Sequence, residues 1–178
     1  MKITFSLTIA AFIALAALSM SVAAQDFTGK IETKFDSDKG ETNVELRNIP
    51  MSGTHGKLAL ANLSISYPGK TAPKKFDDDV LFIVSVVNDR GHRYPPINDV
   101  SFSSGSKKIA RALLLNLDQR DMDSTSVLET IGTRMQISEF QSLAAATTDV
   151  TFKIGETTFT IPASSMAYFA TFYKTIRP

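Results

Sequence analysis

Apolar and polar residues alternate along most of the chain after residue 29, and a period of two residues is typical of a β-strand with one face on a core. Two such strands, over residues 30–35 and 43–47, flank the polar turn 36–40 and predict a β-hairpin. A third strand is expected over residues 57–67. Its apolar positions change parity along the way, so we expect a bulge near Ala61-Asn62 to restore a common face.

The segment Val80–Val87 is apolar on both parities and rich in β-branched residues. This pattern predicts a central strand that is covered on both faces, reached through an irregular connection over residues 69–79. Residues 107–117 fit a strand or a helix. A strand is favoured, because two lysines at the start would oppose a helix dipole and residues 103–106 resemble a hairpin turn.

Between residues 127 and 137 the odd positions are again mostly apolar and predict a further strand. Ser138 and Gln141 then have the S-x-x-Q spacing of a capping box. This spacing predicts a helix that begins at Ser138, packs through Phe140, Leu143 and Ala144, and fades at residues 147–148.

The last part of the chain predicts one hairpin and one helix. Residues 150–154 and 159–161 alternate around the turn Gly155-Glu156. After Pro162, an apolar stripe at three- and four-residue spacings predicts a helix that docks on a sheet. In total, about eight short strands and two short helices predict a mainly β fold: a β-sandwich or a partly open barrel whose open edges or ends the helices cover.

The first 24 residues have the features of a signal peptide. Lys2 precedes an apolar stretch over residues 3–18, and the small residues Ser21–Ala24 stand before Gln25. The stretch is shorter than the ~20 residues of a membrane span. We therefore expect export to the periplasm or the medium, a single β-rich domain over residues 25–178, and no membrane span after removal of the signal.

Composition narrows the chemistry of this domain. The whole chain has no cysteine, so disulfides, thiolate chemistry and lipoprotein anchoring through a cysteine are excluded. Without Lys2, the 19 Lys and Arg residues become 18, which balance the 18 acidic residues. This balance offers no reason to expect nucleic acid or an anionic membrane as a partner, and no cofactor is predicted.

The stretch NDRGHRYPP, which follows the most apolar run, is the main candidate for a ligand loop. Its candidate residues are Asp89, Arg90, His92, Arg93 and Tyr94. Asn, Asp and Gly suit a turn and the two prolines stiffen its exit, so a solvent-facing structural turn is the first interpretation. If the protein binds a ligand, this loop is where we expect the contact, because loops on a rigid scaffold carry most recognition.

Metal and catalytic motifs are weak. Asp121 and Asp123 are candidates for an ion site in a loop, although a polar hairpin tip explains them more simply. Zinc would need His55 and His92 brought together from separate loops. The sequence has no G-x-S-x-G elbow, and its partial matches to a phosphate-binding loop and to S-x-x-K lack their partner residues.

The C-terminal two-thirds of the domain resembles a loose class of exported bacterial β-rich proteins of unknown function. The residues that carry the likeness are Arg93-Tyr94, Glu129, Phe140, Leu143–Ala145, Val150–Gly155 and Phe159–Ile161. The resemblance implies a sandwich-like domain and brings no activity with it. The sequence therefore predicts a non-enzymatic binding or scaffolding domain for an unknown protein or small-molecule partner. The alternative is a small hydrolase or metal-dependent enzyme that uses His92 and Asp89.

Overall fold

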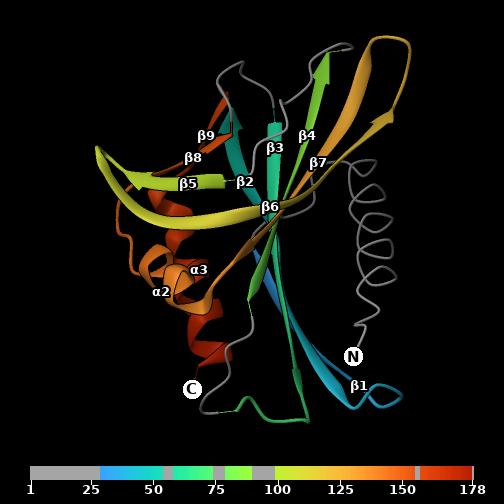
Figure 1. Ribbon diagram of the computed structural model, residues 1–178, viewed down its shortest axis with the longest axis vertical. Helices are drawn as coiled ribbons and strands as arrows, with labels where there is room; N and C mark the ends of the chain where they lie inside the picture. Colours follow the sequence, from blue (N-terminus) through green and yellow to red (C-terminus); the bar gives the residue numbers. More distant parts are fainter. Residues whose placement is uncertain (1–28, 54–57, 74–78, 90–98, 155–156, 178) are drawn as a thin grey trace.

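The protein forms one antiparallel sheet that partly closes into a ring, with two helices on its inner side (Figure 1). The computed structural model describes residues 29–53, 58–73, 79–89, 99–154 and 157–177. In these ranges the elements are β1 (Lys30–Asp36), β2 (Glu41–Gly53), β3 (Leu58–Pro68), β4 (Val80–Asp89), β5 (Asp99–Ser104), β6 (Lys107–Asp121), β7 (Ser126–Met135), α2 (Ile137–Ala144), β8 (Val150–Ile154), β9 (Thr157–Ile161) and α3 (Ala163–Ile176).

The order of strands in the sheet is β1-β2-β3-β4-β7-β6-β5-β8-β9, and β9 pairs back onto β2. The ring closes through two register pairs, Ser52 with Thr160 and Gly53 with Phe159. All strands except β1 belong to the ring, and β1 lies outside it on β2. Of the two predicted architectures, the partly open barrel is therefore the one that forms.

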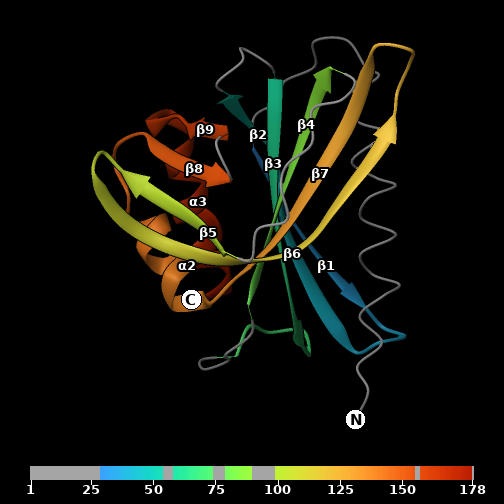
Figure 2. The ribbon, with the colours of Figure 1, turned by 45° about the horizontal axis from the view of Figure 1, so that its top comes forward.

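The helices lie inside the curve made by β5, β6, β8 and β9, as two views of the ribbon agree (Figures 1 and 2). Phe82 of β4 and Phe102 of β5 meet edge to face, with ring centroids 5.1 Å apart. Phe140 of α2 packs on Phe172 of α3 in the same manner at 5.6 Å. Such fully buried aromatic pairs add to the hydrophobic stabilisation of the core.

Strand β6 confirms the preference for a strand at residues 107–117. It pairs with β5 over its first half and with β7 over its second half. Where β7 does not reach, α2 lies beside β6, and the backbone N–H of Arg111 donates to Glu139 Oε2 at 2.9 Å. The helix thus covers an otherwise open stretch of strand edge, as predicted.

Most predicted elements are confirmed, including the hairpin of β1 and β2, the hairpin of β8 and β9, and the central position of β4. On β4, Phe82 and Val84 face the core, while Ile83 and Ser85 are buried on the opposite face. The strand is thus covered on both sides. Within the described residues, no helix has the length and apolar character needed to cross a membrane.

The predicted bulge at Ala61-Asn62 is wrong. Strand β3 keeps its alternation, and the irregularity lies opposite, in β2 between Leu46 and Ile49. Asn48 there adopts a left-handed conformation with φ 59°, and its N–H donates to Asn62 Oδ1 at 2.9 Å. The change of apolar parity in β3 has a different cause: Leu60 is buried on the face opposite the main core.

The capping box at Ser138 is also wrong. Helix α2 begins at Ile137 with Gln136 as its N-cap, and no side chain caps it. The carbonyl of Gln136 accepts the N–H of Phe140 at 2.9 Å, so Ser138 already lies within the first turn. The helix ends at Ala144 with Ala145 as its C-cap, before the predicted fading point, and it packs through Phe140, Leu143 and Ala144 as predicted.

Candidate functional site

Several connections leave the sheet at one common end. Strands β2, β3, β4, β7 and β6 are successive antiparallel neighbours, so the ends of β2, β4 and β6 and the starts of β3 and β7 coincide. We call this the loop end; it is marked by Gly53, Asn88, Asp121 and Ser126. The segments 54–57, 90–98 and 122–125 start there, so topology sends both histidine-bearing segments from the same end of the sheet.

A buried carboxyl group lies just inside the loop end. Glu129 of β7 has no exposed surface, although it stands on the face that carries the apolar core. Its register partners are Val86 on β4 and Gln119 on β6. The next residue of the same face of β7, Ile131, belongs to the core. Glu129 therefore introduces a polar group into an otherwise mostly apolar inner face, with the buried Val127 between it and the loop end.

Two amide side chains satisfy this carboxyl group. Gln119 Nε2 donates to Oε1 at 2.5 Å, and Asn88 Nδ2 donates to Oε2. Asn88 is buried and Gln119 is exposed, so the cluster spans from the interior to the surface. Hydrogen bonds to a buried carboxyl group are strong because water does not compete with them. The three residues together tie the ends of β4, β6 and β7 to one another.

The predicted ligand loop begins directly at this cluster. Asn88, its first residue, is the buried amide that donates to Glu129, and Asp89 is the last residue of β4. Arg90, His92, Arg93 and Tyr94 lie outside the described residues, as does His55. The structure therefore fixes the point from which the loop leaves and does not test its predicted contacts.

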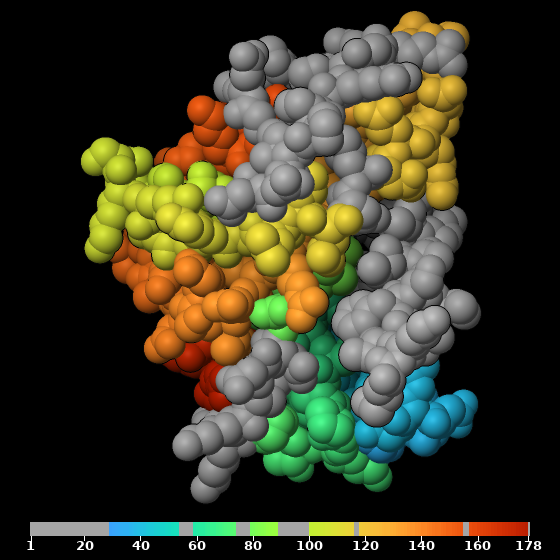
Figure 3. Space-filling model, in the orientation of Figure 1, coloured from blue at the N-terminus to red at the C-terminus, as the bar shows by residue number. Residues whose placement is uncertain are grey.

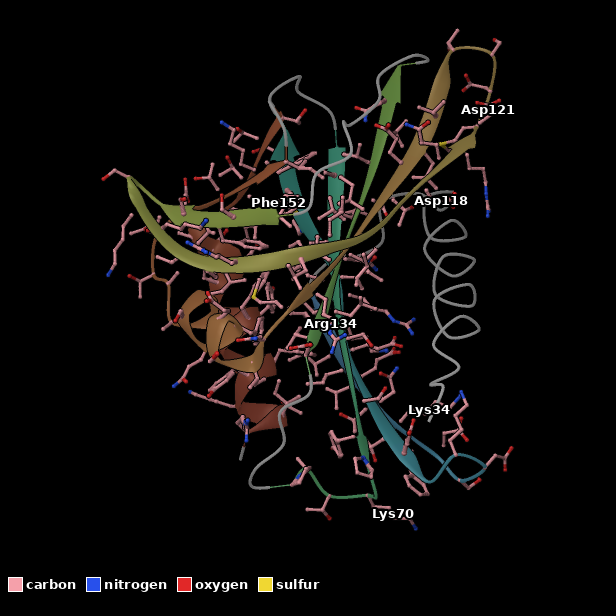
Figure 4. All side chains as sticks on the ribbon, viewed as in Figure 1. Lys34, Lys70, Asp118, Asp121, Arg134 and Phe152 are labelled. Carbon is pink, nitrogen blue, oxygen red and sulfur yellow. The ribbon has the colours of Figure 1, made fainter. Side chains whose placement is uncertain are left out.

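The β6–β7 hairpin tip holds the two predicted ion ligands, and Figure 4 shows Asp121 near this tip. Asp123 Oδ1 accepts the backbone N–H groups of Thr125 at 2.7 Å and of Ser126 at 2.8 Å, and Oδ2 accepts the Ser126 hydroxyl at 2.6 Å. These bonds, first the one from the Ser126 hydroxyl, hold the pKa of Asp123 well below its ordinary range. The carboxylate thus organises its own turn.

Metal-binding residues do not gather in the described part of the chain: it has no group of three or more His, Asp or Glu side chains suited to one ion. A shallow open depression of about 550 Å³ lies elsewhere, between Lys108–Arg111 of β6 and the α2 residues Ser138, Glu139 and Ser142. Glu139 is already engaged there with the backbone of Arg111. The residues that line this depression therefore do not indicate a catalytic or metal site.

Sequence reasoning missed Glu129 as the centre of a cluster. A signal was present, since Glu129 occupies an odd position in the segment 127–137, whose other odd positions are mostly apolar. A charged residue at core parity within a strand indicates either a buried polar network or a site. The partners could not be read from the sequence, because Asn88 and Glu129 are 41 residues apart.

Comparison of the chain with models of protein families, with curated proteins and with solved structures finds no match in any of the three. The residues and geometry of this chain are therefore the only basis on which a function is proposed below.

Proposed function

We propose that the protein is an exported, non-enzymatic binding module that holds an anionic group of its partner at the loop end of the sheet. The observation that carries the proposal is the buried cluster of Asn88, Gln119 and Glu129, which ties the end of β4, where segment 90–98 starts, to the adjoining ends of β6 and β7. Binding loops on a rigid framework are the usual arrangement for recognition. The signal peptide expected over residues 1–24 is the reason to place this binding outside the cytoplasm.

The charge of the two loops favours an anionic ligand. Segments 54–57 and 90–98 contain Lys57, Arg90 and Arg93 together with both histidines, and neither segment contains an acidic residue. Guanidinium groups bind carboxylates and phosphates with paired hydrogen bonds. Two of the described acids at this end are held within the protein: Asp123 by its own turn and Glu129 by two amides. Asp89 and Asp121 also lie at this end, so the cationic side chains of the two loops would have to outweigh them.

Binding of defined probes tests the proposal. Isothermal titration calorimetry should show a saturable heat of binding with poly-L-glutamate and with inorganic phosphate. Poly-L-lysine should show no saturable heat. At a hundredfold excess over Kd, the bound probe should add about 2.7 kcal/mol to the unfolding free energy. The variant Arg90→Ala/Arg93→Ala should lose this binding.

A matched control removes the same charge elsewhere. Lys107→Ala/Lys108→Ala also deletes two cations, from the exposed start of β6, and should bind poly-L-glutamate as the natural chain does. Equal losses in both double variants would mean that only net charge matters and would contradict the proposal. Binding of zinc or calcium that is reversed by EDTA, without binding of either anion, would instead favour the metal-dependent alternative.

Export is tested separately. When the full sequence is expressed in a bacterial host, the purified protein should begin at Gln25 and be found outside the cytoplasm. A protein that keeps Met1 and stays in the cytoplasm would contradict the export part of the proposal.

A further inference from the structure

Strand β1 forms one border of the sheet. It pairs with β2 along its whole length, from Lys30 with Arg47 to Asp36 with Glu41. Within the described part of the chain, β1 pairs with no other strand. Every second residue of β1 therefore directs its N–H and C=O away from β2. In the space-filling view the β1–β2 hairpin forms a projecting corner of the molecule (Figure 3).

The sequence of β1, KIETKFD, is complementary to itself in the antiparallel direction. When two copies are aligned about Thr33, Lys30 stands opposite Asp36 and Glu32 opposite Lys34. Ile31 then faces Phe35, and the two Thr33 residues face each other. Opposite charges, paired apolar side chains and Thr–Thr pairs are all favourable across neighbouring strands.

This alignment also keeps each face of the sheet consistent. Ile31 and Thr33 pair with the buried Leu46 and Val44 of β2, so the odd residues of β1 lie on the core face. The even residues lie on the opposite, charged face. Each pair in the alignment joins residues of the same parity, so the core face of one copy continues as the core face of the other.

Neighbouring registers are unfavourable. A shift by two residues in one direction places Lys30 opposite Lys34 and Glu32 opposite itself. The opposite shift places Glu32 opposite Asp36 and Lys34 opposite itself. Like charges directly opposite each other are destabilising, and a shift by one residue sets the charged face against the core face. The pattern thus favours one register.

The charged side chains are accessible for such pairing. The side chains of Lys30, Glu32 and Asp36 are 75%, 40% and 43% exposed. Lys34 is exposed, makes no ion pair within the described residues, and lies well away from the loop end in Figure 4. Glu32 Oε1 contacts Lys30 at 2.9 Å and Oε2 contacts Arg47 at 3.7 Å within its own chain, so Lys34 of a second copy would join this group as a third cation.

We propose that two copies of this chain associate through antiparallel pairing of their β1 strands, about a two-fold axis at Thr33, so that the sheet continues from one copy into the other. A two-fold interface of this kind uses the same residues on both copies and closes on itself. It leaves the loop end of each copy free, because β1 flanks the sheet on the other side of β2. The proposal is independent of the ligand.

Charge exchange between two variants tests this interface. In a dimer of Lys34→Glu, two carboxylates face each other at both copies of the pair between positions 32 and 34. In a dimer of Glu32→Lys, two ammonium groups face each other at the same places. A mixed dimer of the two variants restores opposite charges at both places. Lys107→Glu, at the exposed start of β6, makes the same charge change as Lys34→Glu away from β1 and serves as the control.

Sedimentation equilibrium on protein purified from its full coding sequence measures the association. We expect the natural chain and Lys107→Glu to dimerise, each charge variant to dimerise about thirtyfold more weakly, and the equimolar mixture to recover the natural affinity. Circular dichroism should show a folded sheet in every variant. A natural chain that stays monomeric at millimolar concentration, a Lys34→Glu variant that is folded and dimerises normally, or a mixture without recovery would each overturn the proposal.

Discussion

Removal of the buried carboxyl group at position 129 should loosen the loop end of the sheet. Glu129→Ala deletes the acceptor for two amides, Asn88 and Gln119. Asn88 is only 5% exposed, and a buried donor that loses its acceptor costs about 1–3 kcal/mol. Gln119 is exposed and can turn to water. With about 1 kcal/mol for the space left by the shortened side chain, the expected loss is about 2–4 kcal/mol.

Three further variants show which groups account for this loss of stability. Glu129→Gln keeps the shape and one acceptor oxygen, so it should cost about 1 kcal/mol. Gln119→Ala should also cost less than about 1 kcal/mol, because its amide stands at the surface. Glu41→Ala removes an exposed carboxyl group at the opposite end of β2 and should change stability by less than about 0.5 kcal/mol.

Urea unfolding followed by far-ultraviolet circular dichroism measures these differences, since the chain has no tryptophan. Hydrogen exchange should locate the effect: in Glu129→Ala the backbone amides at the end of β4 should exchange faster, while those of β8 and β9 keep their order of protection. If Glu129→Ala is as stable as the natural chain, or if β4 keeps its protection, the cluster does not hold the strand ends and the reasoning is refuted.

Three further predictions concern single residues. The Ser85 hydroxyl is buried on β4 without a hydrogen-bond partner in the described part of the chain, so Ser85→Ala should raise the free energy of unfolding by about 1 kcal/mol in urea titrations; a loss would show that the hydroxyl is satisfied. Asn48 has φ 59°, so Asn48→Ala should lower the thermal midpoint and Asn48→Gly should not; equal effects would refute a conformational cause. Asp123 has a lowered pKa, so its stabilisation is present above the ordinary carboxyl pKa of 3.8 and is lost as pH falls through its lower folded value. The stability gap between the natural chain and Asp123→Ala should therefore shrink in acid, and a gap that widens there would contradict the sign.

Local patterns predicted most of the elements and few of their partners. The alternation in β1, β2, β8 and β9 identified both hairpins, because in a hairpin the pairing partner is the next strand along the chain. The pairings of β5 with β8 and of β2 with β9, which close the ring, join distant segments. Alternation specifies which face of a strand is buried and not which strand lies beside it, so the ring could not be derived.

The two wrong local predictions have separate causes. The change of apolar parity in β3 was explained by a bulge, while the second face of the sheet buries Leu60 as well. The S-x-x-Q spacing at Ser138 was outweighed by the position of Gln136, whose carbonyl receives the first helical hydrogen bond. In β3, burial on the second face of the sheet explains the pattern without a bulge, and at α2 the backbone enters the helix before Ser138.

The candidate site could be predicted only in part. The loop after β4 was identified from its residues, and the structure adds that it starts from a buried amide at Asn88. Glu129 was named only among the residues that carry the resemblance, and its place at the centre of a buried cluster was missed, because that role depends on amides from two other strands.

The most direct test of the account is a map of backbone amide shifts by nuclear magnetic resonance during titration with poly-L-glutamate. If the loop end is the binding end, the amides of Gly53, Asn88 and Asp121 should shift together and saturate with one affinity. The opposite ends of the same strands, at Glu41, Val80 and Lys107, should stay unchanged. Shifts confined to those opposite ends, or no saturable shifts at all, would contradict the proposed function.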